Sequence, residues 1–438
     1  MPWVFGATSR PWFQARHRCQ NKAASALNTS GHIHVDVIVV GAGVAGATFA
    51  AILKDSGINC ALVEAEPGKK IKGTGKLASA DPRTLALTQA SKNIMQAIGA
   101  WDEIPEDRLG CFRKMYVWDE NGLGEVNFNG ADMCEPIMGY IVEQKVVEQA
   151  LESVLNKSEH LSWYRPAKAK LLNTEKDKIC IGLDDGRQLS AKLLVAADGQ
   201  LSAIRRLAGI NFKIHDYHQH ALSCVVETEL PHQQIARQRF LSHGPLAFLP
   251  MAQADRCGIV WSTTAEHAAE LKVLDEKTFN KTLAEAFAYQ AGEIIKSGPR
   301  ATFPLARAQT AEYCRPRLAI VGDAAHRIHP LAGQGANLGL LDVACLAEVI
   351  LRAKERGRDI GAFSVLRKYE RWRKGENSTM MMTMEGFKYL FENKNVVVSW
   401  LRNVGMDVFD SMKPVKHSVM KRAMGLAGDL PAIARKRY

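Results

Sequence analysis

Residues 41–46 form a pattern that can bind a pyrophosphate. They read Gly-Ala-Gly-Val-Ala-Gly and follow a run of apolar residues typical of a buried strand. Glycines in this spacing allow a tight turn, let a phosphate approach the backbone, and pack a helix closely on a strand. A second apolar strand ends in an acidic residue at the distance expected for a ribose-binding carboxylate. We therefore predict a dinucleotide site that includes Gly41, Gly43, Gly46 and Glu64.

Two later strand ends also combine a carboxylate with a glycine. The apolar run 193–197 ends in Asp198-Gly199, and the run 318–321 ends in Gly322-Asp323. Ligands of parallel sheets lie beyond the carboxyl ends of the strands. Asp323 is therefore placed to accept hydrogen bonds from a sugar-like hydroxyl.

A helix is predicted to begin near Gln334, directly after a loop rich in proline and glycine. The spacing of Leu338, Leu341 and Leu346 is helical. The first turn of such a helix offers unpaired N–H groups and the positive end of its dipole to a ligand in the loop. Neighbouring glycines let that ligand approach the backbone closely.

The elements that must position these residues alternate between strands and helices. In a doubly wound sheet the three strand ends converge on one edge, which an extended dinucleotide requires and a small ligand does not. Further expectations are a helix over 142–155, a helix that already includes Leu85, and a hairpin turn at 184–186. Residues 212–305 alternate strand-like runs with one helical region near 275–292, which predicts a second, sheet-based domain.

These motifs resemble those of the flavoprotein aromatic hydroxylases. The resemblance rests on Gly41-x-Gly43-x-x-Gly46, Asp198-Gly199-x-x-Ser202-x-x-Arg205 and Gly322-Asp323. The spacing from His329 to Asp342 is similar to that of the ubiquinone-biosynthesis hydroxylases of the UbiH/VisC type, and the resemblance spans roughly residues 33–430. Several segments are most similar to the VisC (UbiI) branch, namely 231–238, 247–250, 259–261, 367–371 and 422–426.

The resemblance implies an α/β fold of the para-hydroxybenzoate hydroxylase-like type, in which a Rossmann-type sheet is interleaved with an antiparallel substrate domain. The FAD-binding domain would be discontinuous, and C-terminal helices would complete the chain. The expected divisions are an N-terminal extension (1–32), an FAD-binding domain (33–110, 140–210 and 315–365), a substrate domain (111–139 and 211–314) and a C-terminal helical region (366–438).

The resemblance also assigns cofactor contacts. The three glycines would hold the FAD pyrophosphate, Glu64 the adenosine ribose, and Asp323 the ribityl chain. Arg83 and Gln144 would lie near the phosphates or the adenine, and the motif of Asp198 and Arg205 is linked to both FAD and the reductant. The loop and helix start would face the flavin pyrimidine ring, with Pro330, Gly333, Gln334, Gly335, Ala336 and Asn337 as the expected contacts.

The implied reaction is reduction of FAD, formation of a flavin hydroperoxide with O2, and transfer of one oxygen atom to an electron-rich phenol ring. In the VisC branch the substrate is a polyprenylphenol, hydroxylated at C5. Another ring position and a non-catalytic FAD-binding scaffold are the alternatives. The residues single out no catalytic base; His326 and His329 are candidates by proximity alone, and no metal site is expected. The electron donor would be NADPH or a separate electron-transfer protein.

Composition bears on compartment and partners. The nine cysteines stand singly, which favours reduced thiols, and the net charge of +11 is concentrated at the two ends of the chain. No nucleic-acid-binding motif accompanies the basic residues. An apolar substrate and a basic, methionine-rich C-terminal region favour a peripheral membrane surface or other quinone-biosynthesis proteins as partners. A homo-oligomer is an open alternative.

The location follows from the same features. We expect the bacterial cytoplasm, peripheral to the inner membrane. The alternative is the matrix side of the mitochondrial inner membrane, because residues 1–32 contain arginine and serine and no acidic residue, as in a presequence. A non-native upstream start or a disordered tail would explain those residues equally well.

Overall fold

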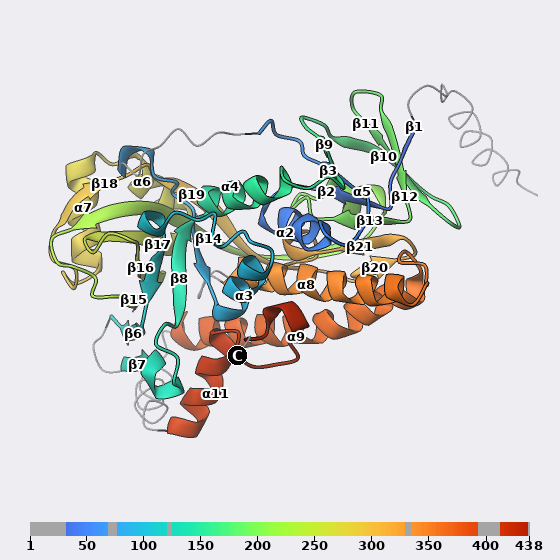
Figure 1. Cartoon of the computed structure of the whole chain (residues 1–438). Coiled ribbons are helices and arrows are strands. Elements are labelled where there is room, and N and C mark those ends of the chain that lie inside the picture. Colours follow the sequence, from blue (N-terminus) through green and yellow to red (C-terminus); the bar gives the residue numbers. More distant parts are fainter. Residues whose placement is uncertain (1–31, 69–76, 121–124, 329–333, 393–411, 437–438) are drawn as a thin grey trace, which may run out of the picture.

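The computed structural model describes residues 32–68, 77–120, 125–328, 334–392 and 412–436 (Figure 1). Three predicted site residues, His329, Pro330 and Gly333, lie outside these ranges, as does nearly all of the N-terminal extension.

A six-stranded sheet forms the centre of the first part of the fold. Its central parallel strands are short, apolar and buried, as expected for strands covered on both faces of a sheet, whereas the parallel strand at one edge is partly exposed. In spatial order they are β20 (Cys314–Arg315), β21 (Leu318–Ile320), β13 (Leu193–Ala196), β2 (Val37–Val40), β3 (Cys60–Val63) and β9 (Leu161–Tyr164).

The predicted convergence of strand ends is confirmed. Ala196 at the end of β13 lies between Val40 of β2 and Ile320 of β21, and Val40 lies beside Val63 of β3. All four strands are parallel to one another, so the segments that follow them leave the sheet at the same edge. The glycine motif at 41–46, the two glycine–carboxylate motifs and Glu64 are thereby brought together.

Helices pack against this sheet and against one another. α2 (Val44–Leu53) packs against α4 (Gln144–Leu155) and α8 (Gln334–Glu355), and α8 packs in turn against α9 (Phe363–Glu392). Figure 1 shows α8 and α9 running side by side beneath the sheet. The helix that we predicted from residue 142 begins at Gln144, because the preceding residues belong to β8 (Gly139–Glu143).

A nine-stranded sheet forms the second part. It includes strands from both predicted substrate segments, and also β22 (His326–Arg327), which pairs with β19 although we assigned it to the first domain. Its main path is β22, β19 (Ala301–Thr310), β14 (Phe212–Thr228), β17 (Arg256–Thr264), β16 (Gly244–Pro250), β15 (Ile235–Leu241), β6 (Lys114–Asp119) and β7 (Glu125–Asn129), with β18 (Ile294–Ser297) paired to β14.

The single helical region predicted near 275–292 is wrong in extent. Two helices are present, α6 (Ala265–Val273) and α7 (Glu276–Ala286). α6 has no strongly one-sided apolar pattern, and a side-chain cap from Thr264 starts it. Phe279 and Leu283 of α7 pack into the core of the nine-stranded sheet.

Two small sheets complete the described strands. β1 (His32–His34), β12 (Gln188–Ala191), β11 (Ile179–Leu183) and β10 (Ala169–Thr174) form one, with the predicted turn at 184–186 between β11 and β12. β4 (Thr84–Leu87), β8 and β5 (Gly110–Phe112) form the other. Leu85 therefore lies in a strand, and the helix that we placed there is α3 (Gln89–Ala97), capped by Thr88.

The C-terminal part is helical. After α9, the described chain resumes before α11 (Lys413–Ala423), whose Met420 packs with Phe112 and Met138 between the two parts of the fold. Short helical turns follow β13, as α5 (Ala203–Leu207), and β21, at Gly322–Ala324. Among the described helices, none has both the length and the apolar character needed to cross a bilayer.

Candidate cofactor and substrate site

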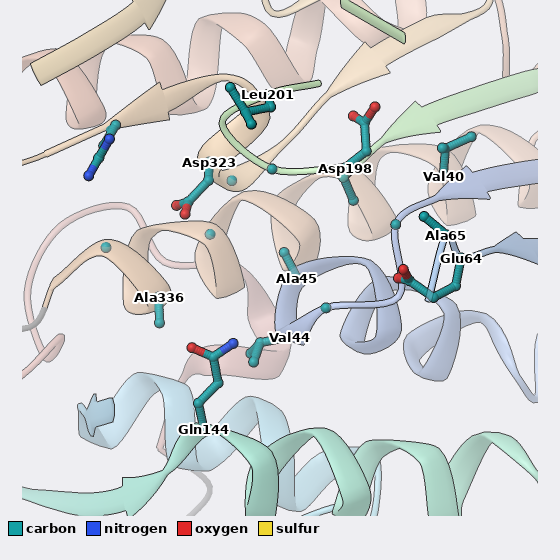
Figure 2. Close-up of a pocket in the computed structure, with 18 of the residues that line it drawn as sticks. Val40, Val44, Ala45, Glu64, Ala65, Gln144, Asp198, Leu201, Asp323 and Ala336 are labelled. Atoms are coloured by element: carbon teal, nitrogen blue, oxygen red, sulfur yellow. The ribbon is translucent and has the colours of Figure 1, made fainter. Parts of the chain in front are cut away.

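A cavity of about 1010 Å³ lies where the carboxyl edge of the six-stranded sheet meets β4 and the nine-stranded sheet. Figure 2 shows side chains from several separate segments directed toward this space. Most of the predicted cofactor contacts within the described ranges line it, namely Gly41, Gly43, Glu64, Arg83, Gln144, Asp198, Gly199, Gly322, Asp323, Gly335 and Ala336.

The three glycines of the first motif have different physical roles. Gly41 has a φ of +99°, and a Cβ there would lie 2.4 Å from the carbonyl oxygen of Ala197. A Cβ on Gly46 would lie 1.9 Å from the carbonyl oxygen of Gly41. Gly43 has no neighbour within 4 Å of such an atom, so it leaves open space at the start of α2. Two glycines thus permit the turn, and the third leaves room for a phosphate beside the helix N-terminus.

Glu64 is held at one end of the cavity. Its carboxylate accepts hydrogen bonds from the backbone N–H of Ala42 at 2.7 Å and of Glu66 at 3.0 Å. A carboxylate has about four acceptor positions, so both oxygens retain capacity for the hydroxyls of a ribose. Lys168 and Lys170 lie on the cavity wall as well, and sequence reasoning did not include them.

Asp198 has one satisfied and one unsatisfied carboxylate oxygen. Oδ2 accepts the N–H groups of Ala203 at 2.7 Å and Ile204 at 3.1 Å, which fixes the start of α5. Oδ1 is buried and has no hydrogen-bond partner among the described residues. Buried polar atoms are rarely left unpaired, so this oxygen indicates a partner that the protein chain does not supply.

Arg205 joins two of the motifs. Its buried guanidinium donates to the carbonyl oxygens of Ala324 and Gln200, both at 2.7 Å, and stacks 3.7 Å from the ring centre of Phe212. It does not lie on the wall of the cavity, where we expected it to contact FAD or the reductant; Arg206 and Leu207 lie there instead. The Asp198 motif therefore binds to the Gly322 turn through Arg205.

Asp323 lines the cavity together with two arginines, Arg83 and Arg327. Loss of solvent raises the pKa of the Asp323 carboxyl, and this effect outweighs the charges of His326, Arg327 and Arg83, which favour the ionised form. The side chain itself is exposed to the cavity. The Arg83 guanidinium lies 4.0 Å from the ring centre of Phe303. Arg327 donates to Gln200 and to the carbonyl oxygen of Pro304.

Two residues that we predicted for the site, His326 and Asn337, instead make buried hydrogen bonds to other protein groups. His326 is 2% exposed, does not line the cavity, and lies with Nε2 2.5 Å from Oδ2 of Asp342. Asn337 at the start of α8 accepts from Thr88 N–H and Ser91 Oγ and donates to the Ala86 carbonyl. Asn337 therefore attaches α8 to β4 and α3, and the described contacts give His326 no access to a reacting atom.

The far end of the cavity is mainly apolar, and sequence reasoning did not find it. Alternate residues of the central strands of the nine-stranded sheet face it, with a side chain from the segment after β22. They are Ala221, Ser223, Val260, Phe303, Leu305 and Ile328. Strand periodicity shows that alternate residues share a face, but it does not show which face meets another domain.

These features fit FAD. The cavity lining includes the carboxylate of Glu64 and the helix N-terminus at Gly43, where a side chain would fill the space. It also contains the unpaired oxygen of Asp198 and the first turn of α8, with Gly335 and Ala336 on the wall.

Comparisons with known proteins agree with this geometry. Residues 34–382 match the family described as FAD binding domain. The ubiquinone hydroxylase UbiL of Rhodospirillum rubrum is 33% identical over 390 residues, which cover 89% of each chain. The mitochondrial ubiquinone biosynthesis monooxygenase COQ6 of Xenopus tropicalis is 33% identical over 448 residues, covering 90% of this chain and 94% of that one.

A solved structure has the same fold. The p-nitrophenol 4-monooxygenase PnpA of Pseudomonas putida superposes with a TM-score of 0.74 at 19% identity, covering 91% of this chain and 99% of that one. This confirms the predicted para-hydroxybenzoate hydroxylase-like fold.

Proposed function

The chain belongs to the ubiquinone-biosynthesis hydroxylase family of FAD-dependent monooxygenases, and we propose that it hydroxylates the ring of a polyprenylphenol at C5. The observation that carries this proposal is similarity along about nine-tenths of both chains to UbiL and COQ6, combined with a cavity that has a dinucleotide end and an apolar end. Segments similar to the VisC branch support the choice of C5 over other positions.

Residues that line the cavity would contact several parts of FAD. The N-terminus of α2 beside Gly43 would bind the pyrophosphate, Glu64 the adenosine ribose and Asp323 the ribityl chain. The positive end of the α8 dipole, near Gly335, would stabilise negative charge on the flavin ring. When bound, FAD supplies the chemistry that reduces O2 and transfers one oxygen atom to the substrate.

The apolar end would bind the aromatic ring. Ala221 and Val260 are smaller than Phe303 and Ile328 in the same lining, which would leave room for a planar group. An apolar enclosure also excludes water from the site of reaction. The guanidinium groups of Arg83 and Arg327 border this space, and their charge would favour the phenolate form of the substrate, which is more easily attacked by an electrophilic oxygen.

We propose that the direct reductant is either NADPH or a separate electron-transfer protein. We also propose that the protein works at the surface of a membrane, since a polyprenylphenol is itself a lipid.

The proposal is tested by expressing the chain in bacterial strains that each lack one ring hydroxylase of quinone synthesis. We expect quinone to return only in the strain blocked at C5, measured by mass spectrometry of extracted quinones and intermediates. Rescue of a strain blocked at another position would replace C5 by that position. Bound FAD without rescue of any strain would contradict the proposed reaction and favour a non-catalytic scaffold.

A further inference from the structure

A buried charged cluster joins α9 to α8, away from the cavity wall. Its members are Asp342 of α8 and Arg373 and Asn377 of α9, with exposed fractions of 0%, 3% and 0%. Arg373 Nε donates to Asp342 Oδ1 at 2.9 Å, and Asn377 Nδ2 donates to the same oxygen at 3.0 Å. Arg373 Nη2 also donates to Asn377 Oδ1 at 2.7 Å. A buried ion pair is tolerated when its remaining hydrogen-bonding groups are satisfied in this way.

The other oxygen of Asp342 binds the segment that carries Asp323. Oδ2 accepts the backbone N–H of Gly322 at 3.2 Å and lies 2.5 Å from His326 Nε2. Burial opposes ionisation of Asp342, but His326 and Arg373 outweigh it, and the pKa falls to about 2. One ionised carboxylate therefore holds both ends of the turn 322–326, and Asp323 lies between those ends.

The same face of α9 continues toward the cavity region. Met381, one turn beyond Asn377, packs with Ile328 and Leu338, and Gln309 of β19 donates to Ser378 Oγ at 3.1 Å. These contacts attach α9 to the segment after the turn, to the start of α8 and to the nine-stranded sheet. The orientation of the turn thus depends on a helix whose described side chains do not line the cavity.

We propose that Arg373 and Asn377 are positioning residues, which act through Asp342 to hold Asp323 in the orientation that binds FAD. This inference rests on the FAD-binding part of the proposed function and is independent of the ring position. Arg373 fixes Asp342 through a planar guanidinium that donates to two acceptors at once, a geometry that lysine cannot reproduce. Asn377 completes the set of donors to the buried oxygen.

Two mild substitutions test the proposal in the full-length protein. Arg373→Lys keeps the charge and loses the planar pair of donors, and Asn377→Leu keeps the ion pair and loses the amide. We expect each to weaken FAD binding to the apoprotein by roughly tenfold, the effect of losing one charge-assisted hydrogen bond, and to change the visible circular dichroism of bound flavin. Arg371→Lys on the exposed face of α9 is the matched control and should bind FAD like the parent.

A double-variant cycle separates this role from a purely structural one. Asp323→Asn alone should weaken FAD binding, and the variant Asp323→Asn/Arg373→Lys should be no weaker than Asp323→Asn, because both changes remove the same contact. Fully additive losses, or a fall in apoprotein melting temperature with unchanged FAD affinity, would overturn the positioning role. If Asp323→Asn itself binds FAD normally, the assumed FAD contact fails, independently of Arg373.

Discussion

At the scale of single residues, the absence of a Cβ has different consequences at different glycines of the first motif. The motif was predicted to make a tight turn, to admit a phosphate and to pack a helix on a strand, and the structure shows which glycine is suited to which role. Gly46 is in contact with Gly41, whereas Gly43 borders the cavity. The spacing predicts that these roles are present, but the space around each Cα depends on the fold and is given by the structure.

Two alanine variants test that division. Gly46→Ala should destabilise the apoprotein by about 1–3 kcal/mol, because its Cβ overlaps a backbone oxygen that cannot easily move. Gly43→Ala should unfold at the parent's temperature yet bind FAD more weakly, because its Cβ occupies the space proposed for the pyrophosphate. Thermal unfolding and FAD titration check both, and normal FAD binding by Gly43→Ala would place the pyrophosphate elsewhere.

The ionised carboxylate of Asp323 should lower the stability of the folded apoprotein, although we propose that it binds FAD. Its pKa in the folded apoprotein is raised above the ordinary value of 3.8, so the folded state resists losing this proton. As pH rises above 3.8 through the raised value, the apoprotein should lose stability relative to Asp323→Asn. We expect Asp323→Asn to melt higher than the parent near neutral pH, with a difference that vanishes in acid. A pH-independent difference between the two apoproteins would contradict this account.

At the scale of elements, the buried parallel strands were predictable because they are short, apolar and bounded by glycine or an acidic residue. β4 was missed because Thr84 to Leu87 offers too few residues to show alternation before α3 begins. The first half of β14 is polar and largely exposed, and its pairing with β19 makes it a strand. Such pairing is a tertiary effect that overrides local propensity.

The face of β14 that lines the cavity can be tested by substitution. Ala221 lines the apolar end of the cavity and lies beside Phe303 on β19. Ala221→Phe should leave FAD binding intact and reduce hydroxylation by roughly tenfold or more, since the added ring takes the space of the substrate. Ile214→Phe, at an exposed position of the same strand, is the matched control. Equal loss of FAD and activity in Ala221→Phe would show that this end does not bind the substrate.

At the scale of the whole molecule, the cavity exists because two sheets with independent cores meet at the edge where three motifs converge. Sequence reasoning found the dinucleotide end, since its residues follow a recognisable order along the chain. It did not find Val260 or Arg327, whose place on the wall depends on how the nine-stranded sheet lies against the first. Nor did it find the contacts of α9, which join residues separated by about thirty positions.

The basic C-terminal region carries the proposed membrane contact. Lys421 and Arg422 are exposed at the end of α11, whereas Met420 beside them is buried. Replacing both cations by glutamine should weaken binding to anionic liposomes by about 2 kcal/mol, since each basic residue near such a surface contributes about 1 kcal/mol. Flotation at increasing ionic strength measures this, with Lys281→Gln on α7 as the control. Unchanged flotation of the double variant would remove α11 from the contact.

The most direct test of the account is the source of the oxygen atom in the product. FAD-loaded protein would be given a reductant and a short-chain prenylphenol under ¹⁸O₂, and the product analysed by mass spectrometry. We expect one heavy oxygen atom on the ring, incorporated from O2. Oxidation of the substrate without consumption of O2, or incorporation of oxygen from water, would contradict a monooxygenase built on this cavity.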